Sequence, residues 1–471
     1  MKTISLSIFF LLSCFITKAQ KKLTLQQAVQ MGIANNLDVN QSDLLSQKAA
    51  ITLQQSKAAM YPNLNASLEQ GINQGRTNDP ITNAFINQNV NYSSYGASTN
   101  VVLFNGSSIQ NNIKANALGY KASKMELQQA KDNVTINIIL AYLNVLSAED
   151  VLENSRQLEV VTSKQVDRLD ILNKSGAIPP SQFYDLKGQL ANDEIAVVDN
   201  QAALETAKLN LSQLLNIPYD KSMEVEKLPV DAFNISYVAE PDKIYDTALQ
   251  QFAQIKAVHF RTETAQKNIR ALQGLLYPTL SLGASIGTNY SSAATQSLFL
   301  NSVEVPSNDY VVVNGTQVPV ITKQNNYNTQ KISYNNQLNN NLATGVSLGL
   351  SIPIFNRSQV RSRVKLAKID LKNSELVEQN TKTALQQSIE RAYVNLVNTS
   401  DKYKILLEQV KSFDASFQAA EVRFNAGDIT SVDYLIAKNN LDRTNTNLII
   451  SKYDFVLRSK ILDYYQGKPL W

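Results

Sequence analysis

The sequence predicts a fold of mixed class, in which long α-helices are joined to membrane β-strands and the chain is built from two internal repeats. Three observations predict it. Residues 141–144 (AYLN) return as 392–395 (AYVN), and residues 103–105 and 176–178 also return, in altered form, 251 positions later. One register held over this distance indicates duplication. Apolar residues at steps of three and four predict the helices, and runs of alternating polarity predict the strands.

The first nineteen residues have the features of a secretory signal peptide. A lysine near the start precedes an apolar stretch from Ile4 to Ile16, and Ala19 supplies a small residue at the expected cleavage point. Cys14 is the only cysteine and lies in this leader. The segment LLSC loosely resembles a lipoprotein cleavage box, so lipidation of Cys14 is the alternative to ordinary cleavage. No later segment approaches the roughly 20 apolar residues of a membrane helix, so insertion is expected to use strands.

The first repeat, residues 20–218, carries a short, a long and a second short helix. Their expected ranges are 24–60, 107–172 and 181–215. Thr24 and Gln27 form the pattern of a capping box at the start of the first helix. At about 1.5 Å per residue, the long helix reaches on the order of 100 Å.

The second repeat, residues 242–471, has the same order and follows a linker over 217–241. Its expected helices are 242–276, 358–424 and 431–465. In the long helix the apolar residues follow a coiled-coil pattern, as at Leu406, Val410 and Phe413. The two short helices of a repeat together match one long helix in length. The linker is therefore expected to form an equatorial belt where the short helices meet.

Each repeat also carries two expected strands around a polar loop. The strands are about 62–72, 96–105, 278–290 and 344–355, and the loops are 73–94 and 289–341. The apolar residues of the strands alternate over about ten positions, which is typical of membrane strands. Four strands cannot close a barrel in lipid, because the smallest membrane barrels have about eight and no open edge is tolerated. Either several chains share one barrel, or the strands are not membrane strands.

Catalysis, metal binding and cofactor binding are not expected. His259 is the only histidine of the chain, which leaves no histidine-rich metal cluster and a single possible base for a catalytic triad. The scattered glycines form no phosphate-binding loop ahead of a helix. A formal net charge of +4 over 471 residues does not favour nucleic acid as a partner.

Several motifs, in their order and doubled spacing, resemble the TolC-like outer-membrane efflux proteins, or outer membrane factors. They are the opening LTLQQAV, the Tyr-Pro-x-Leu junctions at Tyr61 and Tyr277, the strand exits at Leu103 and Ile354, and the Gly-x-Ile turns at Gly176 and Gly427. The resemblance covers essentially the whole mature chain. It implies a homotrimer with one twelve-stranded barrel in the outer membrane, four strands from each chain, continued by a long α-helical barrel in the periplasm.

The same resemblance implies a passive exit duct for a tripartite efflux pump or a type I secretion system. Its partners would be a periplasmic adaptor protein and an inner-membrane transporter, with lipid around the barrel. Drugs, metals and polypeptides all stay open as cargo. The main alternative is a secreted, non-membrane coiled-coil scaffold of the cell envelope, which would pack its four strands as a small sheet. The regular alternation of the strands favours the duct.

The resemblance also implies site residues at the inner end of the helices. In the family, acidic residues just after the second turn narrow the periplasmic entrance. The matching stretch keeps Asp433 but replaces the second acid by Ile436, and Asp433 and Tyr434 are the candidate gate residues. Spacing alone also fits Asp433 to a helix cap with Thr430, where a carboxylate stabilises the helix dipole by about 0.3 to 1 kcal/mol. The candidate adaptor contacts are Gly176, Ile178, Gly427 and Ile429.

Overall fold

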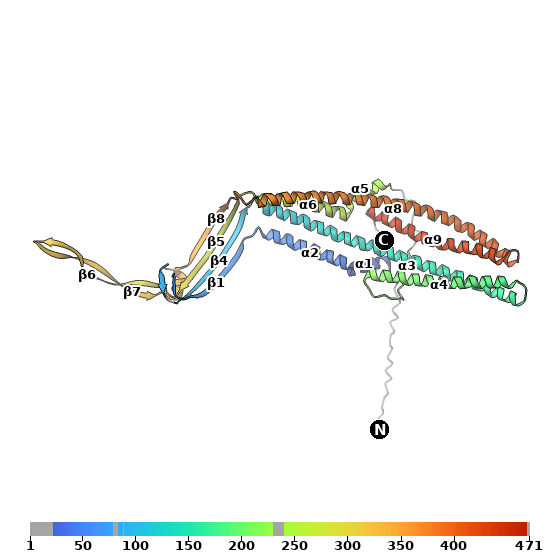
Figure 1. Ribbon diagram of the computed structural model, residues 1–471, viewed down its shortest axis with the longest axis horizontal. Coiled ribbons are helices and arrows are strands. Elements are labelled where there is room, and N and C mark those ends of the chain that lie inside the picture. The colour runs from blue at the N-terminus through green and yellow to red at the C-terminus, as the bar shows by residue number, and fades with distance from the viewer. Residues whose placement is uncertain (1–21, 79–82, 88, 229–239, 469–471) are drawn as a thin grey trace, which may run out of the picture. The chain divides into compact units, whose positions relative to one another are not determined.

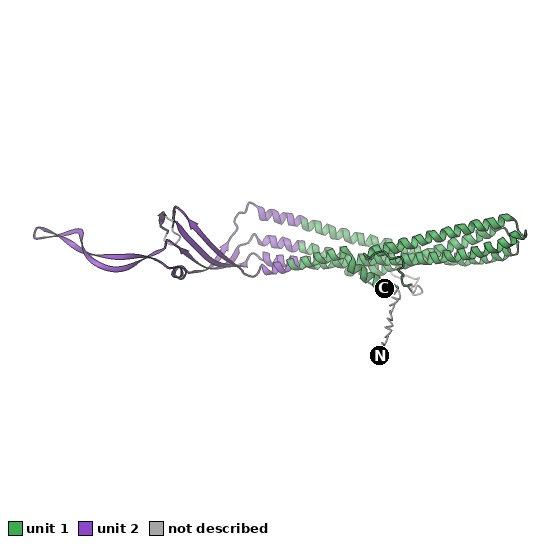
Figure 2. Ribbon diagram, turned by 90° about the horizontal axis from the view of Figure 1, so that it is seen from below, with its two compact units in different colours: residues 1–51, 117–264, 370–471 green, residues 52–116, 265–369 purple. Residues whose placement is uncertain are grey.

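The computed structural model describes residues 22–78, 83–87, 89–228 and 240–468 (Figure 1). The expected signal peptide, with Cys14, lies outside these residues, as does part of the expected linker. The chain divides into two compact units (Figure 2). Unit 1 comprises residues 1–51, 117–264 and 370–471, and unit 2 comprises residues 52–116 and 265–369.

Helices occur in the same order in both repeats. The first repeat has α1 (Leu25–Asn35), α2 (Leu37–Ala58), α3 (Ser108–Lys174) and α4 (Pro180–Leu215). The second has α5 (Pro241–Gln251), α6 (Ala253–Gly274), α8 (Gln359–Asn425) and α9 (Ser431–Tyr465). Each of the two long helices, α3 and α8, has 67 residues. That length corresponds to about 100 Å.

The first short helix of each repeat is interrupted by one residue, whereas the sequence predicted continuous helices over 24–60 and 242–276. Asn36 separates α1 from α2, with φ −69° and ψ 127°. Phe252 separates α5 from α6, with φ −67° and ψ 126°. The Asn36 side chain accepts a hydrogen bond from the Val39 amide at 3.0 Å and so caps the start of α2. Neither residue is a glycine or a proline, so the sequence carried no strong signal for the break.

The duplicated AYxN motif lies in the core of unit 1. Tyr142 is fully buried, and its hydroxyl lies 2.8 Å from the carbonyl oxygen of Leu23 and 2.7 Å from that of Glu226. It therefore ties α3 to the segment before α1 and to the described part of the linker. Tyr393, the counterpart of Tyr142, packs against a second buried cluster that contains Ile389.

Among the described residues, α3 is the one helix that is long and apolar enough, by composition, to cross a membrane. The sequence predicted no such segment after the leader. Half of the most apolar 18-residue stretch of α3 is buried inside the protein. Packing in the helical core therefore accounts for about half of this apolar stretch.

Unit 2 contains a four-stranded antiparallel sheet with the order β1-β4-β5-β8. The strands are β1 (Asn63–Asn73), β4 (Val90–Phe104), β5 (Thr279–Ser291) and β8 (Ala343–Ser351). β4 begins earlier than the expected residue 96 and takes up the end of the expected loop over 73–94. Serine and asparagine are frequent in this part of β4, which hid the strand in the sequence. β8 ends before the expected residue 355.

The register of the sheet places apolar residues on one face and small polar residues on the other. Cross-strand pairing aligns Ala66 with Ala97, Ala97 with Ile286, and Ile286 with Thr344. Because side chains alternate along a strand, these rows fix both faces. The apolar face carries Leu64, Leu68, Val101, Leu282, Ile286, Val346, Leu348 and Leu350. The polar face carries Asn65, Ser67, Glu69, Ser94, Ser98, Asn100, Ser285 and Ser347.

The second expected loop, over 289–341, is largely a β-hairpin and not a loop. β6 (Thr295–Val313) pairs with β7 (Thr316–Lys331) (Figure 1). The short helix α7 (Tyr334–Asn340) follows in the chain. Asn314 and Gly315 form the turn, both with positive φ, 52° and 80°. Two positive φ values are the requirement of the tight hairpin turn that Asn-Gly favours. The shorter first loop contains the small pair β2 (Arg76–Asn78) and β3 (Phe85–Asn87).

Candidate functional site at the helical tips

Two equivalent turns close the helical hairpins of unit 1. Gly176, between α3 and α4, has φ +72°, and Gly427, between α8 and α9, has φ +77°. In the first turn the Ala177 amide donates to the Leu172 carbonyl at 2.9 Å, and in the second the Asp428 amide donates to Arg423 at 2.9 Å. This bond spans five residues, as in a Schellman motif, which needs a left-handed residue after the helix. Glycine supplies that conformation in both turns.

Asp433 caps the helix that follows the second turn. Its amide donates to the Thr430 hydroxyl oxygen at 3.2 Å, and its carboxylate accepts from the Thr430 amide at 3.2 Å and from the Thr430 hydroxyl at 2.7 Å. These bonds form a reciprocal capping box at the start of α9. Hydrogen bonds from the Thr430 side chain and backbone hold the pKa of Asp433 below its usual range. The carboxylate is solvent-exposed and ionised at neutral pH.

Tyr434 has the opposite environment, because its side chain is fully buried inside the tip. Its ring stacks on Phe424 at a centroid distance of 4.7 Å and contacts Phe417 at 5.6 Å. Burial raises the pKa of its hydroxyl, which has no hydrogen-bond partner among the described residues. Of the two candidate gate residues, only Asp433 faces solvent. Tyr434 belongs to the apolar core of the tip.

The remaining candidate residues divide between surface and core in the same way. Gly176 and Gly427 are exposed at the turns. Ile178 and Ile429 are half-buried and pack against the cluster around Tyr434. The structure therefore brings Ile178, Ile429 and Tyr434 into one apolar cluster and leaves the glycines and Asp433 outside it.

The tips also carry exposed apolar side chains that the sequence did not single out. Ile171 is 69% exposed near the end of α3, and Val422, its counterpart 251 positions later, is 70% exposed near the end of α8. Val432 and Ile436 are 55% and 56% exposed on α9, four residues apart and hence on one face. The repeat offset could have identified the first pair, since an apolar residue recurs at the same place beside both turns.

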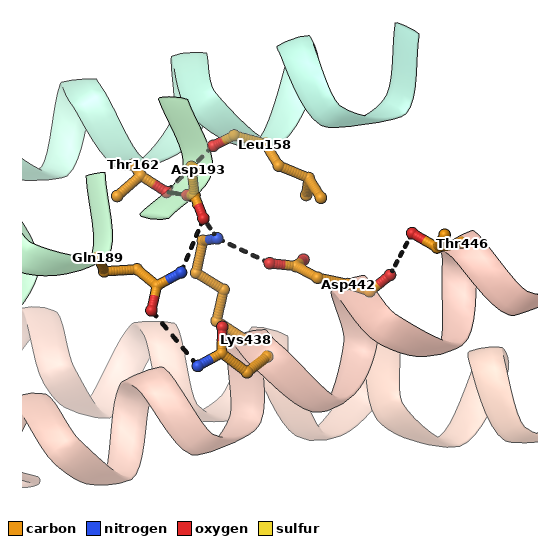
Figure 3. A network of polar contacts seen from close by, with 8 residues as sticks. Leu158, Thr162, Gln189, Asp193, Lys438, Asp442 and Thr446 are labelled. Carbon is orange, nitrogen blue, oxygen red and sulfur yellow. Dashed lines mark hydrogen bonds and ion pairs between the residues drawn. The ribbon is translucent and has the colours of Figure 1, made fainter. Parts of the chain in front are cut away.

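A buried lysine joins the α8–α9 hairpin to the α3–α4 hairpin (Figure 3). Lys438 of α9 lies 3.0 Å from Asp193 of α4 and 2.7 Å from Asp442 of α9, with 2% of its side chain exposed. Thr162 of α3 donates to Asp193, and Gln189 donates to the second oxygen of the same carboxylate at 2.7 Å. The network connects three helices through one cation. Burial raises the pKa of Asp442, and the Lys438 charge opposes that effect.

The acidic side chains and the single histidine are spread over the part of the chain that the structure describes. The described residues contain no group of three or more histidine, cysteine, aspartate or glutamate side chains that could hold a metal ion. His259 is 55% exposed and lies 3.4 Å from Glu378 on the helix surface. Its surroundings are those of an ordinary surface residue.

Comparison with known proteins identifies the family to which the chain belongs. A family model described as outer membrane efflux protein matches residues 28–216 and 301–462. Outer membrane protein TolC of Escherichia coli is 22% identical over 337 residues, which cover 70% of this chain and 60% of TolC. Outer membrane efflux protein BepC of Brucella suis is 20% identical over 451 residues, 93% of this chain and 84% of BepC. The solved structure of CusC is 16% identical, covers 94% of this chain and 92% of its own, and superposes with a TM-score of 0.75.

Proposed function

Because the chain belongs to the outer membrane efflux protein family, whose model matches most of its length, we propose that it is the outer-membrane exit duct of a tripartite efflux pump or type I secretion system. The members of this family are channels and not enzymes. The duct is passive: it offers a path through the outer membrane, and an inner-membrane transporter supplies the energy.

The observation that carries the proposal is the two-faced sheet of unit 2. One face carries most of the leucines, isoleucines and valines of the four strands, and the other carries mainly serine, asparagine and glycine, with Glu69 and Tyr92. In a membrane barrel the apolar face meets lipid and the polar face lines the lumen. β1 and β8 form the two edges of the sheet. Lipid does not tolerate unpaired edges, so neighbouring chains must supply the missing partners. Three chains give a closed barrel of twelve strands.

The helices then form the periplasmic part of the duct, with the tips as its inner end. Exposed apolar residues beside both turns, Ile171 and Val422, support these tips as the contact surface for a periplasmic adaptor. Ile171 and Val422 come just before the turns at Gly176 and Gly427, and α4 and α9 come just after them. Ile178 and Ile429, which follow the two turns and are half-buried, are proposed as further contact residues.

Asp433 is proposed as the entrance residue. Its carboxylate is ionised and exposed at the start of α9, and three copies in a trimer would place three negative charges around the entrance. Capping and gating are compatible, because the cap uses one carboxylate oxygen and leaves the charge in solvent.

Channel recording in planar lipid bilayers tests the proposal. The purified protein is expected to form stable channels, and a trivalent cation on the periplasmic side is expected to block them. Asp433→Asn keeps an oxygen that can accept the Thr430 hydrogen bonds and removes the charge, so it should weaken the block while the capping hydrogen bonds stay in place. A protein that is recovered from cells in the soluble fraction without detergent would instead support the envelope scaffold. An unchanged block in Asp433→Asn would leave this residue with the capping role alone.

A further inference from the structure

We propose that Glu69 sets the ion preference of the channel inside the β-barrel, as a charged ring separate from the entrance. The proposal rests on the proposed function, because it needs the polar face of the sheet to line a lumen. It concerns a different unit from that of Asp433, because Glu69 belongs to unit 2 and Asp433 to unit 1.

The register places Glu69 on the polar face. Its neighbour Leu68 pairs with Tyr95 in the row that belongs to the apolar face, and Glu69 pairs with Ser94 in the next row. Ser94 pairs in turn with Asn289 of β5. Glu69 therefore projects from the same face as the serines and asparagines.

Glu69 is the only charged residue in the four strands of the sheet, all of which the structure describes. The rest of the polar face consists of uncharged and mostly small side chains. A single carboxylate on such a surface dominates its electrostatic potential. In a closed barrel of three chains, symmetry places three copies of this carboxylate at one height.

A tyrosine on the neighbouring strand holds the carboxylate. The Tyr92 hydroxyl donates to Glu69 Oε1 at 3.3 Å. Tyr92 pairs directly with Gly71, and its ring lies over that glycine so closely that an added Cβ would come within 2.6 Å of it. The missing side chain at Gly71 thus makes room for the ring. Gly71 and Tyr92 together position Glu69.

Rings of acidic side chains favour cations in channels, because fixed negative charge lowers the energy of a passing cation and raises that of an anion. The effect reaches about one Debye length, which is about 10 Å at 0.1 M salt and about 3 Å at 1 M. The preference conferred by Glu69 is therefore expected to be strong in dilute salt and weak in concentrated salt.

Reversal potentials under a KCl gradient test the inference with the full-length protein. Glu69→Gln should lower the ratio of K⁺ to Cl⁻ permeability roughly twofold or more near 0.1 M, with little change near 1 M. Glu69→Asp keeps the charge and should retain the wild-type ratio. Glu304→Gln removes one acid from the β6–β7 hairpin, outside the four-stranded sheet, and should also retain it.

The outcomes separate this inference from the proposed function. Wild-type protein that forms no channels would refute the duct itself. Channels of normal conductance whose permeability ratio is the same in Glu69→Gln as in wild type would overturn the role of Glu69 and leave the duct intact. A fall of the same size in Glu304→Gln would also overturn it, because the preference would then follow total charge and not position in the barrel.

Discussion

Lys438 is a single residue on which the packing of the helical tip depends. Two carboxylates from α4 and α9 converge on it, and nearly all of its side chain is out of solvent. Removing one partner from a buried ionic group costs about 3 to 5 kcal/mol, because the remaining charges lose their compensation. Exposed ion pairs contribute far less, about 0 to 1 kcal/mol.

Lys438→Met should therefore reduce the free energy of unfolding by about 3 to 5 kcal/mol. The thermal midpoint of the detergent-solubilised protein should fall accordingly. The difference in stability between wild type and Lys438→Met should be smaller at pH 5 than at pH 8. The pKa of Asp442 is already raised by burial, and loss of the lysine raises it further. A raised pKa in the folded state favours folding at low pH, and this contribution disappears as the pH rises through that pKa. Circular dichroism melting curves at the two pH values provide the measurement.

Lys411→Met is the matched control, because Lys411 pairs with Glu408 at 2.8 Å on the surface, where both side chains are largely exposed. Its midpoint should stay close to wild type at either pH. Equal losses in the two lysine variants would contradict a special role for the buried network.

At the scale of single residues, contacts between residues close in the sequence could be predicted. Contacts and burial that depend on the packing of distant helices could not. Thr430 and Asp433 are three residues apart, so their capping box could be anticipated. Lys438 and Asp442 look like an ordinary surface pair four residues apart, and Asp193 lies far away in the chain. Burial of Tyr434 also depends on α8, which packs over it, and the local sequence alone does not show this.

The two glycine turns show how a helical hairpin is closed at the scale of one element. Gly427 has open space where a Cβ would lie, as does Gly188 within α4. Only Gly427 has a positive φ. The two positions therefore differ in backbone conformation and not in crowding.

Gly427→Ala should destabilise the protein by roughly 1 kcal/mol or more, because alanine is strained at this φ. Gly188→Ala should stabilise it by about 0.5 to 1 kcal/mol, because alanine is the better residue within a helix. Melting curves of the two variants under the same conditions supply the comparison. Two shifts of the same sign would contradict the assignment of strain to the turn.

Element types were predicted well where a pattern was long. The two 67-residue helices begin and end close to the expected residues, because the apolar spacing continues without interruption and the glycines mark the ends. The β6–β7 hairpin was missed, since its strands are rich in asparagine, threonine and glutamine. Its strongest signals were the valines at 311–313 and the Asn-Gly turn that follows them.

At the scale of the molecule, the duplication predicts how strands of neighbouring chains would pair in the proposed trimer, from the pairing within one chain. Within each repeat the pairing is equivalent: Leu64 pairs with Thr99, and Leu280 pairs with Leu350. β4 then pairs with β5 at the junction of the repeats, where Thr99 faces Ala284. The same junction between chains would pair β8 with β1 of the partner subunit. The repeat offsets give the register of this pairing. Thr99 corresponds to Leu350 in the second repeat, and Ala284 corresponds to Leu68 in the first, so Leu350 would lie opposite Leu68 of the partner subunit.

A chain with both Leu68→Cys and Leu350→Cys should form disulfide-linked dimers and trimers in the membrane, because paired residues in a sheet lie within the reach of a disulfide. Within one chain β1 and β8 are three strand spacings apart, about 14 Å, which excludes an internal bond. Non-reducing gel electrophoresis after mild oxidation measures the linkage. Leu64→Cys with Leu350→Cys moves one cysteine by four residues, about 13 Å, and should not link. Linkage in this control alone would refute the register.

The general architecture was predictable because the repeat, the strand alternation and the family motifs all agreed. The proposal that several chains share one barrel rests on the count of four sheet strands, which the structure confirms for one chain. The interruptions at Asn36 and Phe252 did not follow, because neither side chain disfavours a helix enough to break it by itself.

These two interruptions lie 216 positions apart, the same offset that relates Tyr61 to Tyr277. Their backbone angles agree within 2°. Asn36 secures the bend with a side-chain hydrogen bond to the next helix, whereas Phe252 packs against Tyr464 and Tyr465. The same non-helical backbone conformation is thus held at equivalent positions of the two repeats by a hydrogen bond in one copy and by aromatic packing in the other. A side chain that restores only one of these two contacts would therefore suit only one of the two interruptions.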